Sequence, residues 1–256
     1  METGKYFSFE RKENIGILTI NNMPLNIFGE GLYRELLAIE NQLDQEVGLR
    51  AMIINANGKF FSAGIDLNFL KSVNSQFVLD NLGWMQKIYN YWDEQPYPVI
   101  AAVQGLVTGS GVELMLGCDL RVIAEGTKIS MPEVKFGLSP DMGGTSRLTR
   151  LVGVGTAKRI MLTCEEIDAA EAYRIGMCEY LVSPDKLMDK AMELATKMAS
   201  YPPAAVRFAK KGIEVTYEGG LRAGLLFEQA QSTYCCGSQD QKDALQAFLQ
   251  SLHEKK

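Results

Sequence analysis

Short apolar runs that end at glycine-rich loops recur along this sequence, and they constrain its fold more than any other feature. Residues 51–55 and 99–103 are largely apolar runs of strand length, followed by loops of small residues at 60–67 and 104–111. A helical pattern at 112–116 follows the second loop. Continuous apolar runs are typical of strands that helices cover on both faces of a sheet. The pattern therefore predicts an α/β fold.

The remaining periodicity predicts the other elements. Alternation of apolar and polar residues at 6–11 and 15–21 indicates a β-hairpin, and further buried strands are expected at 120–124 and 128–131. Residues 137–144 are expected to form a loop. Apolar residues at helical spacing predict helices over 32–43, 77–92, 155–162, 169–175, 186–200, 203–217, 221–235 and 239–252.

The character of the chain changes at Tyr201-Pro202-Pro203. The residues before this point mix strand and helix, and those after it are helical and amphipathic. We therefore expect a core over 1–200 that holds the active site, and a helical oligomerisation region over 201–256. Amphipathic helices that follow a complete core often pack against a neighbouring subunit, so we predict an oligomer.

Charge and composition exclude several classes of partner and of catalytic site. The 256 residues carry a net charge of −5 without blocks of like charge, so we expect neither nucleic acid nor a membrane as a partner. Cytoplasm is the expected location, because we find no signal-peptide pattern or membrane span. The single histidine, His253, lies near the chain end, which disfavours a Ser-His-Asp triad. No cysteine lies in a C-x-x-C pair, so no metal site is expected.

Proton transfer near neutral pH is therefore expected from Asp and Glu with tuned pKa, or from Lys, Tyr or Cys. Glu113 begins the helix after the second loop, Glu133 follows Met131-Pro132, and Asp141 lies in Pro140-Asp141-Met142-Gly143-Gly144. Each acid alone is explained as well by a helix dipole, a solvated turn or a helix cap.

The two loops share a design that suits anion binding. Small residues after a buried strand let backbone N–H groups approach a ligand, and two such groups aimed at one point form an oxyanion hole. Either loop alone is explained by a tight turn. A dinucleotide fingerprint is rejected, because Leu114 stands where the third glycine belongs.

Taken together, these blocks resemble the crotonase superfamily, the enoyl-CoA hydratase/isomerase family, over almost the whole chain. The central signature is matched by Ala102–Gly105 and Gly109–Leu114, followed by Cys118-Asp119. The first oxyanion loop is matched by Phe61–Leu67, and later blocks by Met131–Glu133 and Gly143–Leu148. Asn22–Ile27 resembles the segment that borders CoA.

The resemblance implies a spiral of β-β-α units with a C-terminal helical trimerisation region, as a homotrimer or a homohexamer made of two trimers. It implies an acyl-CoA thioester as the substrate, with no cofactor, and a thioester oxygen held by the N–H groups of Ile65 and Ser110. The substrate-binding positions that it implies are Leu25, Asn26, Ala63, Gly64, Asp66, Leu67, Gly109 and Phe248.

Two departures from the family pattern are visible. Ser110 stands where the family often has glycine, so its side chain could crowd the thioester. Gln250 and Ser251 replace basic residues expected directly after Phe248, and Lys255 or Lys256 is the expected substitute for binding the CoA phosphates.

Three functions follow from the resemblance. Glu113 and Glu133 match the two glutamates of hydratases, which favours addition of water across the C2=C3 bond of a trans-2-enoyl-CoA. Asp141 matches a working aspartate of double-bond isomerases, so an enoyl-CoA or 3,5-dienoyl-CoA isomerase is the alternative. A non-catalytic acyl-CoA-binding or interaction protein is the third. Trp84, Met85, Ile88 and Trp92 share a helical face and are candidates to line the acyl pocket, although core packing explains at least half of them.

Overall fold

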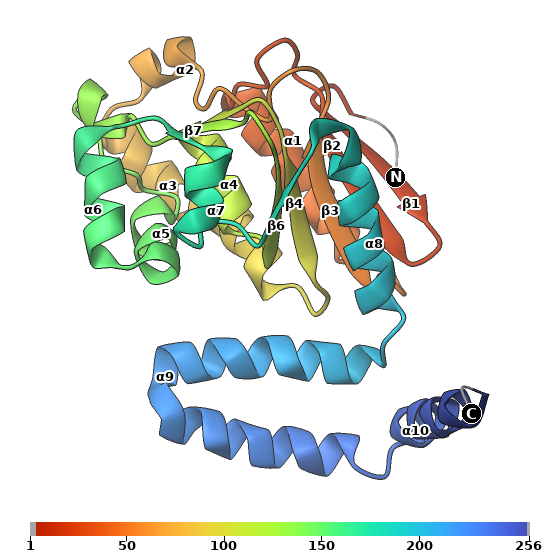
Figure 1. Cartoon of the computed structure of the whole chain (residues 1–256). Coiled ribbons are helices and arrows are strands. Elements are labelled where there is room, and N and C mark those ends of the chain that lie inside the picture. Colours follow the sequence, from red (N-terminus) through yellow and green to blue (C-terminus); the bar gives the residue numbers. More distant parts are fainter. Residues whose placement is uncertain (1–3, 255–256) are drawn as a thin grey trace.

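A six-stranded sheet forms the centre of the molecule, which the computed structural model describes over residues 4–254 (Figure 1). Across the sheet the strands are β1 (Phe7–Lys12), β2 (Ile15–Ile20), β3 (Ala51–Ala56), β4 (Val99–Val103), β6 (Leu120–Ala124) and β9 (Tyr180–Val182). β1 pairs antiparallel with β2, and the other neighbours pair in parallel. The predicted hairpin and the three predicted buried strands of this sheet are confirmed.

A second, smaller sheet lies where the central strands end. It contains β5 (Leu106–Thr108), β7 (Lys128–Ser130) and β8 (Ile167–Asp168), with β5 parallel to β7 and β7 antiparallel to β8. β4 leads directly into β5 and then α4 (Ser110–Leu116), and β6 leads into β7 and then the 3₁₀ turn η1 (Glu133–Phe136). This repeated β-β-α unit confirms the predicted crotonase-type fold.

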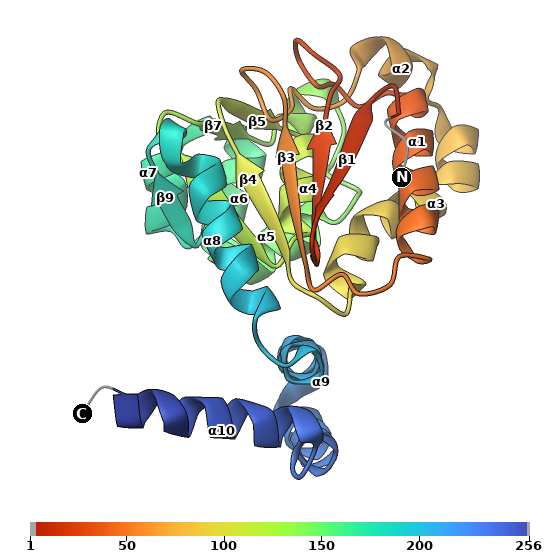
Figure 2. The same cartoon turned by 90° about the vertical axis from the view of Figure 1, so that its right-hand side faces the viewer.

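Helices cover the central sheet on both faces, as Figure 2 shows. On one face α8 (Leu187–Ala199) packs Ala191 and Ala195 against Ile53, Ile100 and Val122. On the other face lie α1 (Glu30–Leu43), α3 (Ser75–Glu94) and α4. Because helices cover both faces, the central strands need apolar residues on both sides, which explains the largely apolar runs of β3, β4 and β6.

The remaining helices connect these layers. They are α2 (Leu67–Ser72), α5 (Gly144–Val152), α6 (Val154–Thr163), α7 (Ala169–Arg174) and the 3₁₀ turn η2 (Pro184–Lys186). Among the residues that the structure describes, no helix is long and apolar enough to cross a membrane.

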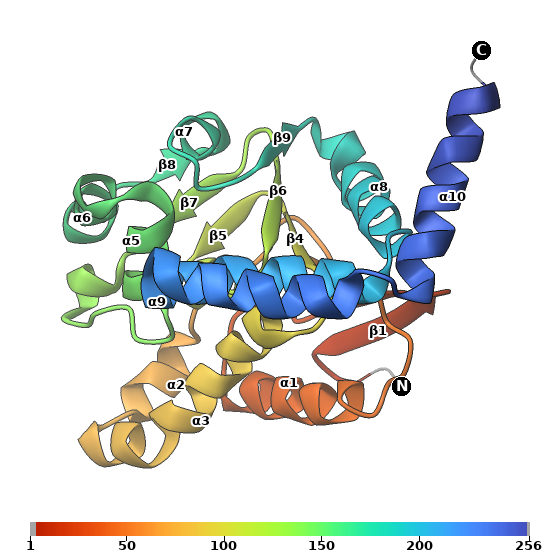
Figure 3. The same ribbon diagram turned by 90° about the horizontal axis from the view of Figure 1, so that it is seen from below.

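The C-terminal helices extend away from the sheet and its covering helices. α9 (Pro203–Cys235) folds back on itself at Gly220, whose φ of 77° and ψ of 175° break the helix into the two arms predicted at 203–217 and 221–235 (Figure 3). α10 (Gln239–Glu254) then projects past them. Both helices expose large apolar side chains to solvent: Ile213, Tyr217, Leu221, Leu225, Leu226, Tyr234, Leu245, Phe248, Leu249 and Leu252.

Several elements differ from the sequence-based expectation: α2, β8 and β9 lie where no element is expected, and two further differences have a clear local reason. Residues 106–108, expected within a loop, form β5, because they pair with β7 and bring the second sheet beside the first loop. The loop expected over 137–144 ends at Gly144, where α5 begins and continues to Val152. β5 was missed because three residues of strand are too few to show periodicity. The start of α5 was missed because its N-cap residue is Gly143 rather than a polar residue.

Candidate active site

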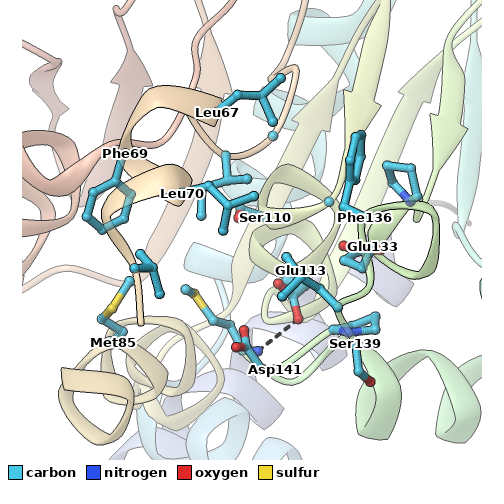
Figure 4. A pocket seen from close by; sticks show the side chains of 18 of the residues that line it. Leu67, Phe69, Leu70, Met85, Ser110, Glu113, Glu133, Phe136, Ser139 and Asp141 are labelled. Atoms are coloured by element: carbon cyan, nitrogen blue, oxygen red, sulfur yellow. Dashed lines mark hydrogen bonds between the residues drawn. The ribbon is translucent and has the colours of Figure 1, made fainter. Parts of the chain in front are cut away.

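A cavity of about 350 Å³ lies between α2, α3 and the segments that follow β3, β5 and β7 (Figure 4). Glu113, Glu133 and Asp141 are all in its wall. So are seven further residues singled out from the sequence: Ala63, Gly64, Ile65, Leu67, Met85, Gly109 and Ser110. The structure therefore brings together acids and loops that are far apart along the chain.

The two glycine-rich loops lie against each other because their backbones pair. Ser62 and Val107 form a parallel bridge, and Gly64 and Gly109 lie at the contact that follows it. A Cβ atom on Gly64 would lie 2.9 Å from the carbonyl oxygen of Thr108, and both glycines have positive φ. A side chain at Gly64 would push Thr108 away, and the positive φ of Gly109 favours glycine there, which explains the glycines at these two positions.

Two backbone amides at this contact are available to a ligand. Within the described residues, the N–H groups of Ile65 and Ser110 donate to no acceptor, whereas those of their neighbours Gly64, Asp66 and Gly109 do. Ser110 is the first residue of α4, so its amide also lies at the positive end of a helix dipole.

The Ser110 side chain is held on the protein side of the site. The hydroxyl of Tyr33, a fully buried residue of α1, donates to Ser110 Oγ at 3.1 Å. Burial raises the pKa of Tyr33 well above its ordinary value, so Tyr33 keeps its proton. This contact anchors Ser110 and offers a structural reason why serine is accepted where glycine is usual.

Glu113 is buried in α4, with 3% of its surface exposed. Its Oε1 accepts the N–H groups of Met142 and Gly144, both at 2.9 Å. Burial raises the pKa of Glu113 to about 7; the two amides oppose this rise, and the nearby Glu133 and Asp141 add to it. A carboxyl with a pKa near neutrality can both accept and return a proton.

Glu133 begins η1 and faces the second loop. A Cβ atom on Gly109 would lie 3.3 Å from Glu133 Oε1. Oε2 of Glu133 is buried and has no hydrogen-bond partner in the part of the chain that the structure describes. Burial raises the pKa of Glu133, its own backbone N–H lowers it, and Asp141 raises it again. A buried oxygen without a partner is a group that a substrate or water can engage.

Asp141 lies in the loop before α5 and lines the cavity beside Glu113 (Figure 4). The residue as a whole is exposed, but partial burial of its carboxyl against the cavity raises its pKa. It therefore adds a third acid to the same cavity, at a more hydrated position than Glu113.

Comparison with known proteins places this architecture in one family. Residues 10–255 match the family model described as enoyl-CoA hydratase/isomerase. The chain belongs to the enoyl-CoA hydratase/isomerase family.

Relatives in this family resemble the chain over nearly its whole length. The short-chain-enoyl-CoA hydratase of Clostridium acetobutylicum is 34% identical, covering 94% of this chain and 93% of its own. The solved enoyl-CoA hydratase of Bacillus anthracis superposes with a TM-score of 0.91 at 33% identity, covering 96% of this chain and 97% of its own. A Thermobifida fusca protein solved in complex with acetoacetyl-CoA has a TM-score of 0.83 at 26% identity, covering 90% and 94%.

The other positions implied by the family resemblance lie in different places. Leu67 lines the main cavity, and Leu25 and Asp66 line a separate cavity beside β1 and α1. Asn26 is completely buried, and its amide nitrogen donates to the carbonyls of Asn57 and Phe60. Its backbone N–H donates to Asn22 and its carbonyl accepts the Ser62 hydroxyl, so Asn26 holds the loop over 22–27 in place.

The predicted C-terminal contacts lie far from the cavity in this chain. Phe248 is on α10, is 59% exposed, and borders a hollow between α9 and α10. Lys255 and Lys256, the expected phosphate-binding substitutes, lie outside the described residues.

The aromatic face of α3 contributes less to the cavity than its spacing suggested. Met85 lines the cavity, whereas Ile88 and Trp92 are buried in the core and Trp84 donates to Asn81. The apolar wall that sequence reasoning missed comes from α2 and the start of α3: Phe69, Leu70, Val73, Phe77, Val78 and Leu82. The capping residue Asp66, which accepts the N–H of Asn68 at 2.8 Å, is the sequence feature that could have located α2.

No group of three or more His, Cys, Asp or Glu side chains within residues 4–254 is arranged to hold a metal ion. The titratable side chains that line the cavity are the carboxyl groups of Glu113, Glu133 and Asp141.

Proposed function

We propose that this protein is an enoyl-CoA hydratase, which adds water across the C2=C3 bond of a trans-2-enoyl-CoA. The observation that carries the proposal is the placement of Glu113 and Glu133 in one cavity wall with the unpaired amides of Ile65 and Ser110. Relatives named enoyl-CoA hydratases, at about a third identity over nearly the full chain, support it.

In this proposal Ile65 and Ser110 form an oxyanion hole. Attack of water at C3 moves an electron pair onto the thioester oxygen and generates an enolate. Two N–H donors already aimed at that oxygen stabilise the new charge without reorganisation, and one such donor is commonly worth about 3 kcal/mol of the barrier. The Tyr33–Ser110 hydrogen bond supports the loop that presents one of the two donors.

The two glutamates divide the proton transfer between them. One carboxylate takes a proton from the attacking water, and the other, protonated, delivers a proton to C2 as the enolate collapses. The product gains one molecule of water, and the pair exchanges its protonation states. Burial, with a smaller contribution from the charge of Glu133, raises the pKa of Glu113 to about 7, which supports Glu113 as the member of the pair that carries a proton near neutral pH.

The acyl group would occupy the apolar end of the cavity, formed by α2 and α3. The complex of a structural relative with acetoacetyl-CoA supports an acyl-CoA as the class of substrate. The reaction as proposed needs the CoA thioester and water, and no cofactor.

A double-bond isomerase is the second candidate, because Asp141 lies in the same cavity as the two glutamates. In that reaction Asp141 would remove a proton at one carbon while another acid returns one further along the chain. Its exposure to solvent favours the hydratase.

The test is a panel of 2-enoyl-CoA and 3,5-dienoyl-CoA thioesters, assayed for hydration and isomerisation. We expect hydration of crotonyl-CoA, reduced about a thousandfold or more by Glu113→Gln and by Glu133→Gln. Hydration retained in either variant contradicts the assignment. Isomerisation of a dienoyl-CoA that is abolished by Asp141→Asn, with no hydration, supports the isomerase.

We also propose that residues 1–200 form the catalytic core and that 201–256 assemble the chain into a homotrimer or a dimer of trimers, in which Phe248 reaches a neighbour's CoA. The exposed apolar stripe of α9 and α10 supports this assembly. The cytoplasmic location expected from the sequence stays a prediction.

A further inference from the structure

The loop before α5, which binds the carboxylate of Glu113, is itself supported by side chains on its opposite side. Glu113 Oε1 accepts two N–H groups of this loop, from Met142 and Gly144. On the other side of the loop lies a separate polar cavity, lined by residues of α3 and α5. Three side chains donate to carbonyl groups of the same loop: Thr145 to Pro140, Gln86 to Asp141, and Arg147 to Met142.

One of these contacts acts on the same peptide group as Glu113. The carbonyl of Asp141 and the N–H of Met142 belong to a single planar peptide unit. Gln86 Nε2 donates to that carbonyl at 2.7 Å, and the N–H donates to Glu113 Oε1 at 2.9 Å. The bond from Gln86 is the shortest of the three that support the loop, since Thr145 and Arg147 donate at 3.1 and 3.4 Å.

We propose that Gln86 is a positioning residue, which fixes the peptide between Asp141 and Met142 so that its N–H points at the carboxylate of Glu113. The inference about catalysis rests on the proposed hydratase function, and the inference about the Glu113 carboxylate does not. Neither the sequence pattern nor the family motifs singled out Gln86.

The physical effect has two parts. A hydrogen bond to the carbonyl restrains rotation of the peptide plane, and it also polarises the peptide, so that the N–H on the other side becomes a better donor. Both effects stabilise the ionised form of Glu113. Loss of the Gln86 contact should therefore raise the pKa of Glu113.

Other titratable groups also face Glu113, and Gln86 donates to none of their side chains. They are Glu133 from η1, Asp141 from the loop, Tyr33 from α1 and Tyr89 from α3. The guanidinium of Arg147 from α5 reaches the Met142 carbonyl and is held by Asn90 at 2.6 Å, so it also stays in place.

The experiment compares Gln86→Met with Gln95→Met. Gln95 follows the same helix, is also half-buried, and its Nε2 donates to a backbone carbonyl, that of Tyr91, at 2.9 Å, away from the loop. Thermal unfolding of both variants checks that each is folded. The ionisation of Glu113 is followed directly by infrared titration of its protonated carboxyl band, which is assigned with Glu113→Gln.

We expect Gln86→Met to raise the pKa of Glu113 by about half a unit and Gln95→Met to leave it unchanged. In hydration assays we expect kcat of Gln86→Met to fall about fivefold with little change in KM, and its pH profile to move to higher pH. An unchanged Glu113 titration in folded Gln86→Met overturns the inference.

The two proposals fail separately. If the wild-type protein hydrates no enoyl-CoA, the proposed function is wrong, and the infrared titration still decides whether Gln86 tunes Glu113. If the wild type hydrates enoyl-CoA and both variants titrate Glu113 with the wild-type pKa, only the role of Gln86 is wrong.

Discussion

At the scale of single residues, the site depends on carboxylates in places that disfavour their charge. Glu113 is almost fully buried, and the two amides that bind it only partly offset that burial. Glu133 has a buried oxygen without a partner within the described chain. Such groups reduce the stability of the free protein and become useful when a substrate and water occupy the cavity.

The raised pKa of Glu113 predicts how stability changes with pH. Its pKa is about 7 in the folded protein and 4.5 in the reference state, so between these values the folded protein binds more protons than the unfolded chain. The stabilisation is fully present below pH 4.5 and is lost as the pH rises through about 7. Its upper bound is about 3 kcal/mol.

The measurement is the free energy of unfolding in denaturant on both sides of that window, at one protein concentration, for the wild type and Glu113→Gln. Glu40 and Asp119 also have raised pKa values and titrate in the same direction, so only the difference between the two proteins reports on Glu113. Equal pH slopes for the two proteins would contradict the prediction.

At the scale of secondary-structure elements, a largely buried lysine of α9 contacts the core. Lys210 Nζ donates to Asp119 Oδ2 at 2.7 Å and to the carbonyl of Tyr97 at 3.2 Å. Asp119 also accepts the N–H of Val99 at 2.7 Å, at the start of β4. The pair therefore joins the first arm of α9 to the start of β4, a central strand.

We predict that Lys210→Met destabilises the fold by about 3 kcal/mol or more, because it leaves the mostly buried Asp119 without its cation. The matched control is Lys211→Met, whose lysine pairs with Glu214 within α9 at the surface and should cost less than about 1 kcal/mol. The double variant Lys210→Met with Asp119→Asn should recover part of the loss. Chemical unfolding measures all three, and equal losses for the two single variants would show that the pair is not an anchor.

At the scale of the whole molecule, α9 and α10 expose apolar side chains that no part of the described chain covers. Leu245, Phe248, Leu249 and Leu252 follow helical spacing along α10, and each is about half exposed. A stripe of this kind on a projecting helix is typical of a subunit contact. It contributes nothing to the cavity in its own chain.

We predict that the wild-type protein sediments with the mass of a trimer or a hexamer and that Leu245→Asp with Leu249→Asp lowers this mass. The control is Val47→Asp, which alters an apolar residue that is 85% exposed in the loop after α1. Analytical ultracentrifugation gives the masses. A monomeric wild type, or an unchanged mass in the double variant, would refute the assembly that we propose.

The sequence by itself determined five of the six strands of the central sheet, where the helical C-terminal region begins, and which acids deserve attention. These features depend on periodicity and composition within a few neighbouring residues, which is why the hairpin, β3, β4 and β6 could be predicted, whereas the three-residue edge strand β9 was not. The family resemblance named Glu113, Glu133 and Asp141, and the structure places all three at one cavity.

Only the tertiary structure decided how those acids are tuned and what surrounds them. The pairing of Ser62 with Val107 brings the two loops together, and Met142 and Gly144 bind Glu113 from about thirty residues further along the chain. Strand β5, the apolar wall from α2 and the support from Gln86 were likewise absent from the sequence-based prediction. The physical reason is that burial, hydrogen-bond partners and pKa depend on contacts between distant segments, and local patterns do not record them.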